Sequence, residues 1–264
     1  MRTLTRPTQK KIATYITEED YWQNYYAAEE AYEWNNGQLE IKPVSDYLTY
    51  LSFRWFSNLL DHFFHTHPIA RTIGLEMGFR LALTHKTTIR KPDLGVILNN
   101  NPVTLDPLDR SFHGICDLCI EVLSDSKLSA SKRDTQTKKA EYLAAGVPEY
   151  YIVHNDKRRC AFYYRNTDGI YAPIQLQNGL IHSVILPGFC FRPGDLILKP
   201  GLEAMMQDPV YRKFVFPDWQ AETQARIAAE QQLVVKMQAQ QQAEARAERL
   251  ASQLLALGID PDVH

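Results

Sequence analysis

The order of apolar and polar positions along the first part of the chain predicts two helices with a hairpin between them. Residues 21–31 form an amphipathic run that predicts the first helix. Residues 32–42 predict a hairpin, because the segment Asn35–Gly37 supplies the turn residues that such a loop prefers. Residues 45–67 repeat apolar side chains at intervals of three and four, which predicts a second helix that Pro68 ends.

Short apolar runs then predict the strands of a sheet. These runs cover residues 73–83, 92–98, 117–123 and 149–153. The segment 131–145 predicts a helix between the last two strands, and Gly146 and Pro148 mark its end. This order of elements favours a mixed β-sheet flanked by helices on both faces, so the fold class expected is α/β.

The composition changes sharply near the C-terminus, where Ala, Gln, Glu and Arg dominate from residue 219 onward. Apolar side chains recur there with the spacing of a heptad, at Ala243, Ala247, Leu250, Leu254 and Leu257. The segment is either a single solvated helix or a short coiled coil. We favour self-association, because a polar helix gains little stability unless its apolar stripe is covered.

These patterns divide the chain into four parts. We expect a polar leader over residues 1–16 and a main domain over residues 17–200. We expect a linker over residues 201–218, followed by a C-terminal helix over residues 219–258.

Charge and composition exclude several classes of protein. The 264 residues are 45% hydrophobic and 23% charged, with a net charge of −2, so wholesale disorder is excluded. A protein that binds nucleic acid by bulk charge is far more basic, so any such contact must be a local patch. The sequence has neither a run long enough to span a membrane nor an apolar signal segment, and we expect a cytoplasmic protein.

Two carboxylates interrupt predicted strands and are the first candidates for chemistry. Asp93 and Glu121 each lie in an apolar run, where an unpaired charge costs several kcal/mol. Converging carboxylates form a site of hard oxygen ligands that suits Mg²⁺ or Mn²⁺. The alternative, which stays open, is that Asp93 only caps a turn at Pro92 and that Glu121 pairs with an interior cation.

Cys116 and Cys119 have the spacing of a metal-binding or redox pair. Residues three apart on one strand point to opposite faces, so we expect buried thiols that bind no metal and form no disulfide.

Several segments together resemble a known family. The matching segments are Pro92-Asp93, Glu121 to Ser124, Asp134 with Lys138 and Tyr142, and Gly146 to Tyr150. In order and spacing these are similar to the bacterial "putative restriction endonuclease" family, a branch of the PD-(D/E)xK nuclease superfamily. The resemblance covers about residues 17–198, and it implies a restriction-endonuclease-like core.

The resemblance also implies roles for individual residues. Asp93 and Glu121 would hold the metal ion. The superfamily usually carries a lysine two residues after that glutamate, but this chain has Leu123 there. Lys138, at the place where the family carries its lysine, is our candidate for assisting the attacking water. The alternative is that Lys138 only pairs with Asp134 on a solvated face.

The function expected is therefore that of a Mg²⁺- or Mn²⁺-dependent endonuclease, with DNA favoured over RNA as substrate. A basic run beside the proposed site would suit a phosphate backbone, and it comprises Lys127, Lys132, Arg133, Lys138 and Lys139. We expect a homo-oligomer, most simply a dimer. The alternative is an inactive nuclease-fold protein that binds or regulates and that oligomerises through its C-terminal helix.

Overall fold

The computed structural model describes residues 15–42, 44–74, 76–124 and 132–257. Most of the predicted leader, Lys127 of the basic run and the last residue of the predicted C-terminal helix lie outside these ranges. The chain divides into two compact units, residues 1–215 and residues 216–264.

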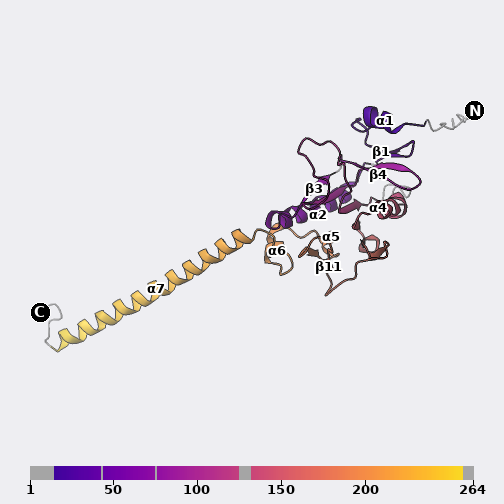
Figure 1. The fold of residues 1–264 in the computed structure, drawn as a ribbon. Helices are drawn as coiled ribbons and strands as arrows, with labels where there is room; N and C mark the ends of the chain where they lie inside the picture. Colours follow the sequence, from indigo (N-terminus) through magenta and orange to yellow (C-terminus); the bar gives the residue numbers. More distant parts are fainter. Residues whose placement is uncertain (1–14, 43, 75, 125–131, 258–264) are drawn as a thin grey trace, which may run out of the picture. The chain divides into compact units, whose positions relative to one another are not determined.

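The first unit is built around a six-stranded mixed sheet (Figure 1). In spatial order its strands are β10 (Tyr171–Pro173), β9 (Ala161–Arg165), β8 (Glu149–Val153), β7 (Leu118–Val122), β6 (Leu94–Leu98) and β3 (Ala70–Gly74). Only β7 and β8 run parallel, as expected for strands joined by a helical crossover.

Two smaller sheets complete the strands of this unit. The four-stranded sheet has the order β2 (Gln38–Ile41), β1 (Tyr32–Asn35), β5 (Thr87–Arg90) and β4 (Phe79–Ala82). The two-stranded sheet pairs β11 (Ile181–His182) with β12 (Cys190–Phe191). The β1–β2 turn has positive φ at Asn36 and Gly37, as a tight two-residue hairpin loop requires.

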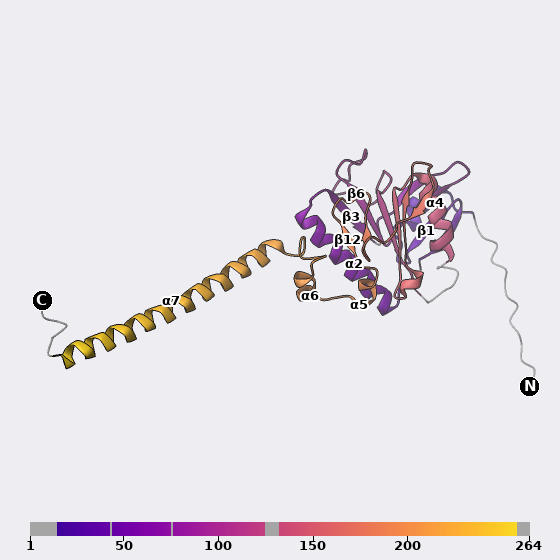
Figure 2. The same cartoon turned by 90° about the horizontal axis from the view of Figure 1, so that it is seen from below.

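Helices cover both faces of the six-stranded sheet. The helical elements of the first unit are α1 (Glu18–Asp20), η1 (Tyr21–Tyr25), α2 (Tyr47–Thr66), η2 (Arg133–Lys138), α4 (Lys139–Ala145), η3 (Lys157–Arg159), α5 (Asp195–Leu198) and α6 (Leu202–Gln207). Helix α2 crosses one face (Figure 2), where Phe56 and Leu59 pack with Leu118 and Ile120 of β7. On the opposite face, Tyr142 of α4 packs with Cys119.

The predicted fold class is confirmed, but the boundaries of three predicted segments differ from those in the structure. The run over residues 73–83 forms two strands, β3 and β4, in different sheets. The first helix ends at Tyr25. The expected linker over residues 201–218 instead folds onto the core as far as Val215, because Tyr211 and Phe214 are buried there.

The second unit consists of one helix, α7 (Pro217–Ala256), in which no residue is buried. Within the described ranges, no helix is both long enough and apolar enough to cross a membrane.

Candidate active site

Asp93 and Glu121 come from neighbouring antiparallel strands. Glu121 lies in β7, and Asp93 directly precedes β6. Leu94 is paired with Ile120, so continuing this register by one residue sets Asp93 opposite Glu121. Directly opposed residues of an antiparallel pair share one face of the sheet, with Cβ atoms about 5 Å apart. The Asp93 carboxylate is anchored by the backbone N–H of Val122, which donates to Oδ2 at 2.8 Å.

Glu121 is buried and is held by two donors. Its Oε1 accepts hydrogen bonds from Lys138 Nζ at 3.0 Å and from the Tyr142 hydroxyl at 2.9 Å. Burial raises the pKa of Glu121 above its ordinary value against the opposing charge of Lys138, and the carboxylates of Asp134 and Asp93 add to the rise. This environment contains more negative charge than one lysine neutralises.

Lys138 lies at the end of η2, and its ammonium group is surrounded by carboxylates. Its Nζ is 3.0 Å from Glu33, 3.0 Å from Glu121 and 3.3 Å from Asp134. Burial alone would lower the pKa of Lys138, but the charges of Glu121 and Glu33 outweigh it and hold the pKa well above its ordinary value. Lys138 is therefore a buried cation. It does pair with Asp134, but the alternative that this pair lies on a solvated face is wrong.

Glu33 also belongs to this cluster. It lies in β1 and is fully buried between aromatic residues. Its carboxylate accepts from the backbone N–H of Lys91 at 2.9 Å and from Arg90 at 3.2 Å. Burial would raise the pKa of Glu33, but the ion pairs with Lys138 and Arg90 reverse this and lower it strongly. A carboxylate inside the short hairpin strand is the only sequence signal that could have found it.

Arg90 anchors Glu33 and was not anticipated from the sequence. It is the last residue of β5 and is fully buried. Its guanidinium binds Glu141 of α4 through Nε at 2.6 Å and Nη2 at 2.9 Å, and Glu40 of β2 through Nη1 at 2.6 Å. The arginine therefore connects the four-stranded sheet to the helix that follows Lys138.

Lys42 forms an ion pair with Asp93. Its Nζ lies 3.2 Å from Asp93 Oδ1 and donates to the Lys91 carbonyl at 2.6 Å. The Asp93 side chain keeps about a fifth of its surface exposed. The sequence did not indicate Lys42, because the two residues of this pair are far apart along the chain.

Asp134 lies close to two cations. Its Oδ1 is buried and accepts no hydrogen bond, but it is ion-paired with Lys138 Nζ at 3.3 Å and with Arg133 Nε at 3.7 Å. Across the described ranges no three acidic, cysteine or histidine side chains already converge as a metal cage. Mg²⁺ is usually held by only one or two carboxylates, with waters and substrate phosphate completing its shell. Asp93 and Glu121, which face each other at the junction of β6 and β7, therefore fit such an ion.

One further sequence expectation can be compared with the structure. Cys116 and Cys119 are free buried thiols that belong to the same core cluster, and Cys116 lies before β7. The argument from strand parity is therefore wrong for this pair.

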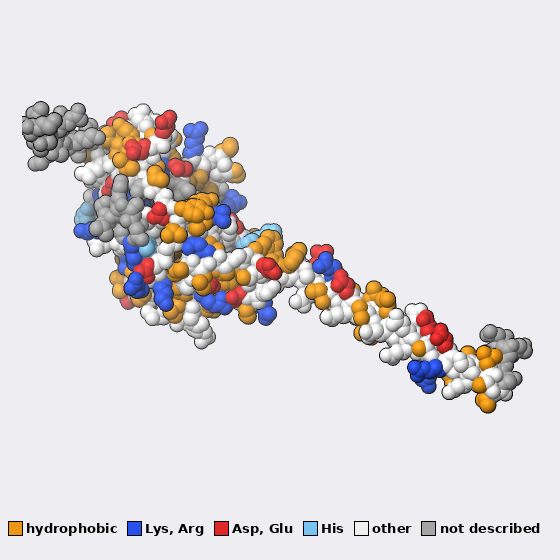
Figure 3. All heavy atoms as spheres, turned by 180° about the vertical axis from the view of Figure 1, so that it is seen from behind, with side chains coloured by type: hydrophobic (Ala, Val, Ile, Leu, Met, Phe, Trp, Pro, Cys, Tyr) orange, Lys and Arg blue, Asp and Glu red, His pale blue; other side chains and the backbone are white. Residues whose placement is uncertain are grey.

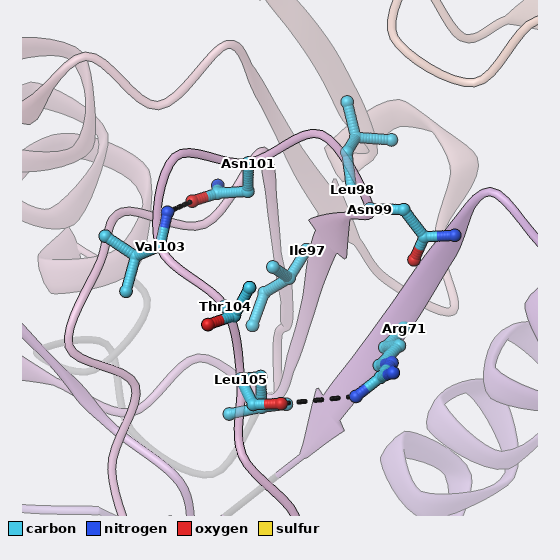
Figure 4. A pocket seen from close by; sticks show the side chains of 8 residues that line it. All are labelled: Arg71, Ile97, Leu98, Asn99, Asn101, Val103, Thr104 and Leu105. Carbon is cyan, nitrogen blue, oxygen red and sulfur yellow. Dashed lines mark hydrogen bonds between the residues drawn. The ribbon is translucent and has the colours of Figure 1, made fainter.

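A separate cavity lies at the opposite end of β6. It has a volume of about 220 Å³, and side chains of β3, of the end of β6 and of the following loop line it (Figure 4). Arg71 reaches across it to donate to the Leu105 carbonyl at 3.2 Å. Asp93 precedes the first residue of β6, so this cavity does not include the acidic cluster.

Comparisons with known proteins agree with this fold. A crystal structure described as a putative nuclease belonging to DUF820 from Anabaena variabilis ATCC 29413 matches with a TM-score of 0.55 and 15% identity, over 70% of this chain and 98% of that chain. At this identity the match shows a shared fold. No curated protein matches the chain. The family model Uma2, described as "Putative restriction endonuclease", matches residues 19–194. Because this match spans more than half of the sequence, the chain belongs to the Uma2 family.

Proposed function

We propose that the protein is a metal-dependent endonuclease that hydrolyses phosphodiester bonds of nucleic acid, with DNA as the favoured substrate. The observation that carries this proposal is the approach of Lys138 Nζ to within 3.0 Å of Glu121. The usual strand position of the lysine is occupied by Leu123, which is buried in the core. In this proposal, Lys138 of the following helical segment supplies the cation that the strand position lacks.

Asp93 and Glu121 would hold the metal ion. Bound Mg²⁺ or Mn²⁺ would supply Lewis-acid polarisation of a phosphate oxygen and lower the pKa of a bound water. Tyr142 orients Glu121 through its hydroxyl, and the Val122 N–H orients Asp93. Both carboxylates are thus held by hydrogen bonds to the protein before any ligand arrives.

Lys138 acts as an electrostatic group in this proposal. Its pKa lies well above the ordinary value, so it does not accept a proton from water near neutral pH. Its fixed charge stabilises the negative charge that develops on the phosphoryl oxygens in the transition state. Glu33 keeps the ammonium group in position by ion pairing with it, and Arg90 in turn holds Glu33.

Incubation of the purified protein with supercoiled plasmid, single-stranded DNA and RNA tests the proposal. Each substrate is combined with Mg²⁺, Mn²⁺ or EDTA, and Asp93→Ala is compared with the wild type. We expect cleavage of DNA that requires metal and that Asp93→Ala abolishes. Absence of cleavage by a folded protein under every condition would contradict the proposal and support the alternative of a binding module with a nuclease fold.

We also propose that the chain forms homodimers to which α7 contributes. This helix exposes Ile227, Leu233, Val234, Met237 and Leu250. Figure 3 shows apolar side chains lying between charged ones along its visible face. Covering such side chains gains on the order of 1 kcal/mol each. A second copy of the same helix offers a matching stripe, and a dimeric nuclease can meet both strands of a duplex.

A further inference from the structure

Helix α2 carries an exposed aromatic platform, which we define as Tyr47, Tyr50 and Arg54. Tyr47 is 71% exposed and Tyr50 is 46% exposed. The two rings are stacked, with centroids 6.2 Å apart and planes inclined by 25°. The Arg54 guanidinium, also exposed, lies 5.9 Å from the centre of the Tyr50 ring.

The platform is separate from the packing role of the helix. Residues at positions i, i+3 and i+7 of a helix lie along one side, and these three follow that spacing. The buried side chains of α2, among them Phe56, Leu59 and Phe63, pack on the sheet instead. The core therefore does not account for two large aromatic rings at the start of the helix.

Two contacts tie this end of α2 to the candidate active site. Asp46 caps the helix by accepting from the Thr49 N–H at 2.8 Å, and its other oxygen accepts from the Ser124 hydroxyl at 2.9 Å. Ser124 follows Glu121 closely along the chain. Lys42, on the segment that leads into α2, pairs with Asp93. The platform thus begins beside the carboxyl end of β7, where Glu121 lies.

We infer that the platform binds unpaired bases of a nucleic acid strand, so that the substrate is single-stranded or locally opened at the site. Every base has a flat π-face that stacks on an aromatic ring, whereas bases inside a duplex are already stacked on one another. Arg54 adds a cation for the phosphate that follows a stacked base. This inference rests on the proposed nuclease function and specifies its substrate class.

The alternative is that a second copy of this chain covers the exposed rings of the platform. The chemistry of the platform favours nucleic acid, because it combines stacked rings with a guanidinium group, and the site that it adjoins contains the further cations Lys42 and Arg133. Nucleic acid carries both the π-faces and the negative charge that match this combination.

Binding measured without turnover tests the inference. Fluorescence anisotropy is recorded in EDTA with labelled single-stranded DNA, single-stranded RNA and duplex DNA of equal length. The double variant Tyr47→Leu/Tyr50→Leu keeps apolar volume but loses both π-faces, and Tyr47→Phe/Tyr50→Phe keeps them. Tyr15→Leu, at another exposed tyrosine, is the matched control.

The expected loss is specific to unpaired strands. Tyr47→Leu/Tyr50→Leu, the leucine pair, weakens binding of single-stranded DNA or RNA by at least about 10-fold, because the stacking of even one base on an aromatic ring contributes that much affinity. Duplex binding changes less than about 2-fold, the phenylalanine pair restores wild-type affinity, and Tyr15→Leu has no effect. Comparing the two single strands shows whether the ribose hydroxyl matters as well.

Three outcomes separate this inference from the proposed function. Equal affinity of the leucine pair and the wild type for single strands overturns the inference, even where the wild type cleaves DNA. A changed sedimentation coefficient of the leucine pair, with unchanged affinity, also overturns it and assigns the platform to self-association. Loss of single-strand binding in the leucine pair, together with a wild type that never cleaves, supports the platform and contradicts the nuclease.

Discussion

At the scale of single residues, the candidate site is a buried network in which each charge depends on partners from other elements. Lys138 is paired with Glu33 and Glu121, and Glu33 is paired with Arg90. Breaking a buried pair by removing one partner costs about 3–5 kcal/mol, because the remaining charge has no compensation. Single substitutions in this network therefore report on stability as well as on chemistry.

The first prediction concerns Lys138→Met, which removes the cation but leaves the carboxylates. We expect cleavage to fall by at least about 100-fold, the usual effect of removing one preorganised transition-state donor. Binding of Mn²⁺ is retained, because the ammonium group is not a ligand. The metal also raises the melting temperature of the variant more than that of the wild type, since it neutralises the uncompensated acids. Calorimetry and plasmid cleavage measure these effects.

Lys139→Met is the matched control for this prediction. The Lys139 ammonium lies 3.5 Å from the centre of the Tyr163 ring rather than among the acids. We expect its cleavage rate to stay within about 2-fold of the wild type, a change of less than about 0.5 kcal/mol in the activation free energy. Unchanged cleavage in Lys138→Met with a loss in Lys139→Met would move the role of the cation to Lys139.

The second prediction uses the lowered pKa of Glu33. Its ordinary pKa is 4.5, and the folded-state value is lower because of Lys138 and Arg90. Ionised Glu33 thus contributes stability above about pH 4.5 that is lost as the pH falls toward the folded-state pKa. Glu33→Gln lacks this contribution at every pH. The gap, that is, the difference in the free energy of unfolding between the wild type and Glu33→Gln, therefore narrows by about 2 kcal/mol from pH 6 to pH 3.

Urea unfolding at fixed ionic strength measures this gap at each pH. A gap that stays constant over the range would show that folding does not lower the pKa of Glu33. Glu76→Gln, at an exposed carboxylate, serves as the control and leaves the pH dependence close to that of the wild type.

The sequence predicted the residues of the site only where local signals existed. Asp93 and Glu121 stood out as carboxylates in apolar strands, and Lys138 through the family resemblance. Arg90 and Lys42 had no such signal, because their partners are distant in sequence and only the folded sheet brings them together. The same limitation explains Cys116, whose position outside β7 invalidated an argument that assumed a continuous strand.

At the scale of elements, the hairpin and α2 were predictable because their signals are local. Turn residues and apolar spacing specify both. The boundary between β3 and β4 was not predictable, since β3 pairs with β6 in one sheet while β4 pairs with β5 in another. The division of residues 73–83 into two strands depends on pairing partners that are remote along the chain, whereas the apolar pattern alone predicts one strand.

The third prediction is made at the start of α2. Asp46→Ala removes the side chain that caps the helix and binds Ser124. We expect the free energy of unfolding to fall by about 1 kcal/mol, the usual cost of losing such a cap. Ser124→Ala removes the tether and leaves the cap, so its loss is smaller. Thermal denaturation compares the two variants. Asp46→Ala removes both the cap and the tether, so an equal loss of stability in Ser124→Ala would show that the tether contributes more than the cap.

At the scale of the whole molecule, the chain combines one folded unit with one isolated helix. The first unit buries its own core as far as Val215, whereas α7 buries none of its residues. Ala243 and Ala247 provide little apolar surface in the predicted heptads, so a coil formed by this helix alone is weak. Contacts of the first unit would have to supplement it in a stable dimer.

The fourth prediction is that charged substitutions in the stripe reduce self-association. At about 10 μM, the wild-type chain sediments as a dimer and Leu250→Glu/Leu254→Glu shifts toward the monomer, because facing carboxylates repel across a coiled-coil seam. Gln241→Glu/Gln242→Glu adds the same charge outside the stripe and is the control. If these three proteins and a chain truncated after Val215 all have the same oligomeric state, α7 does not contribute to self-association and is a solvated helix.

The spread of the site along the chain has a consequence for protein synthesis. Glu33 and Lys138 lie on separate elements, and a ribosome needs on the order of ten seconds to add the residues between them. During that interval the early strands hold acids without their lysine. A nascent chain therefore carries no complete site until the helix with Lys138 has left the exit tunnel, and translation itself delays the moment at which the protein becomes competent.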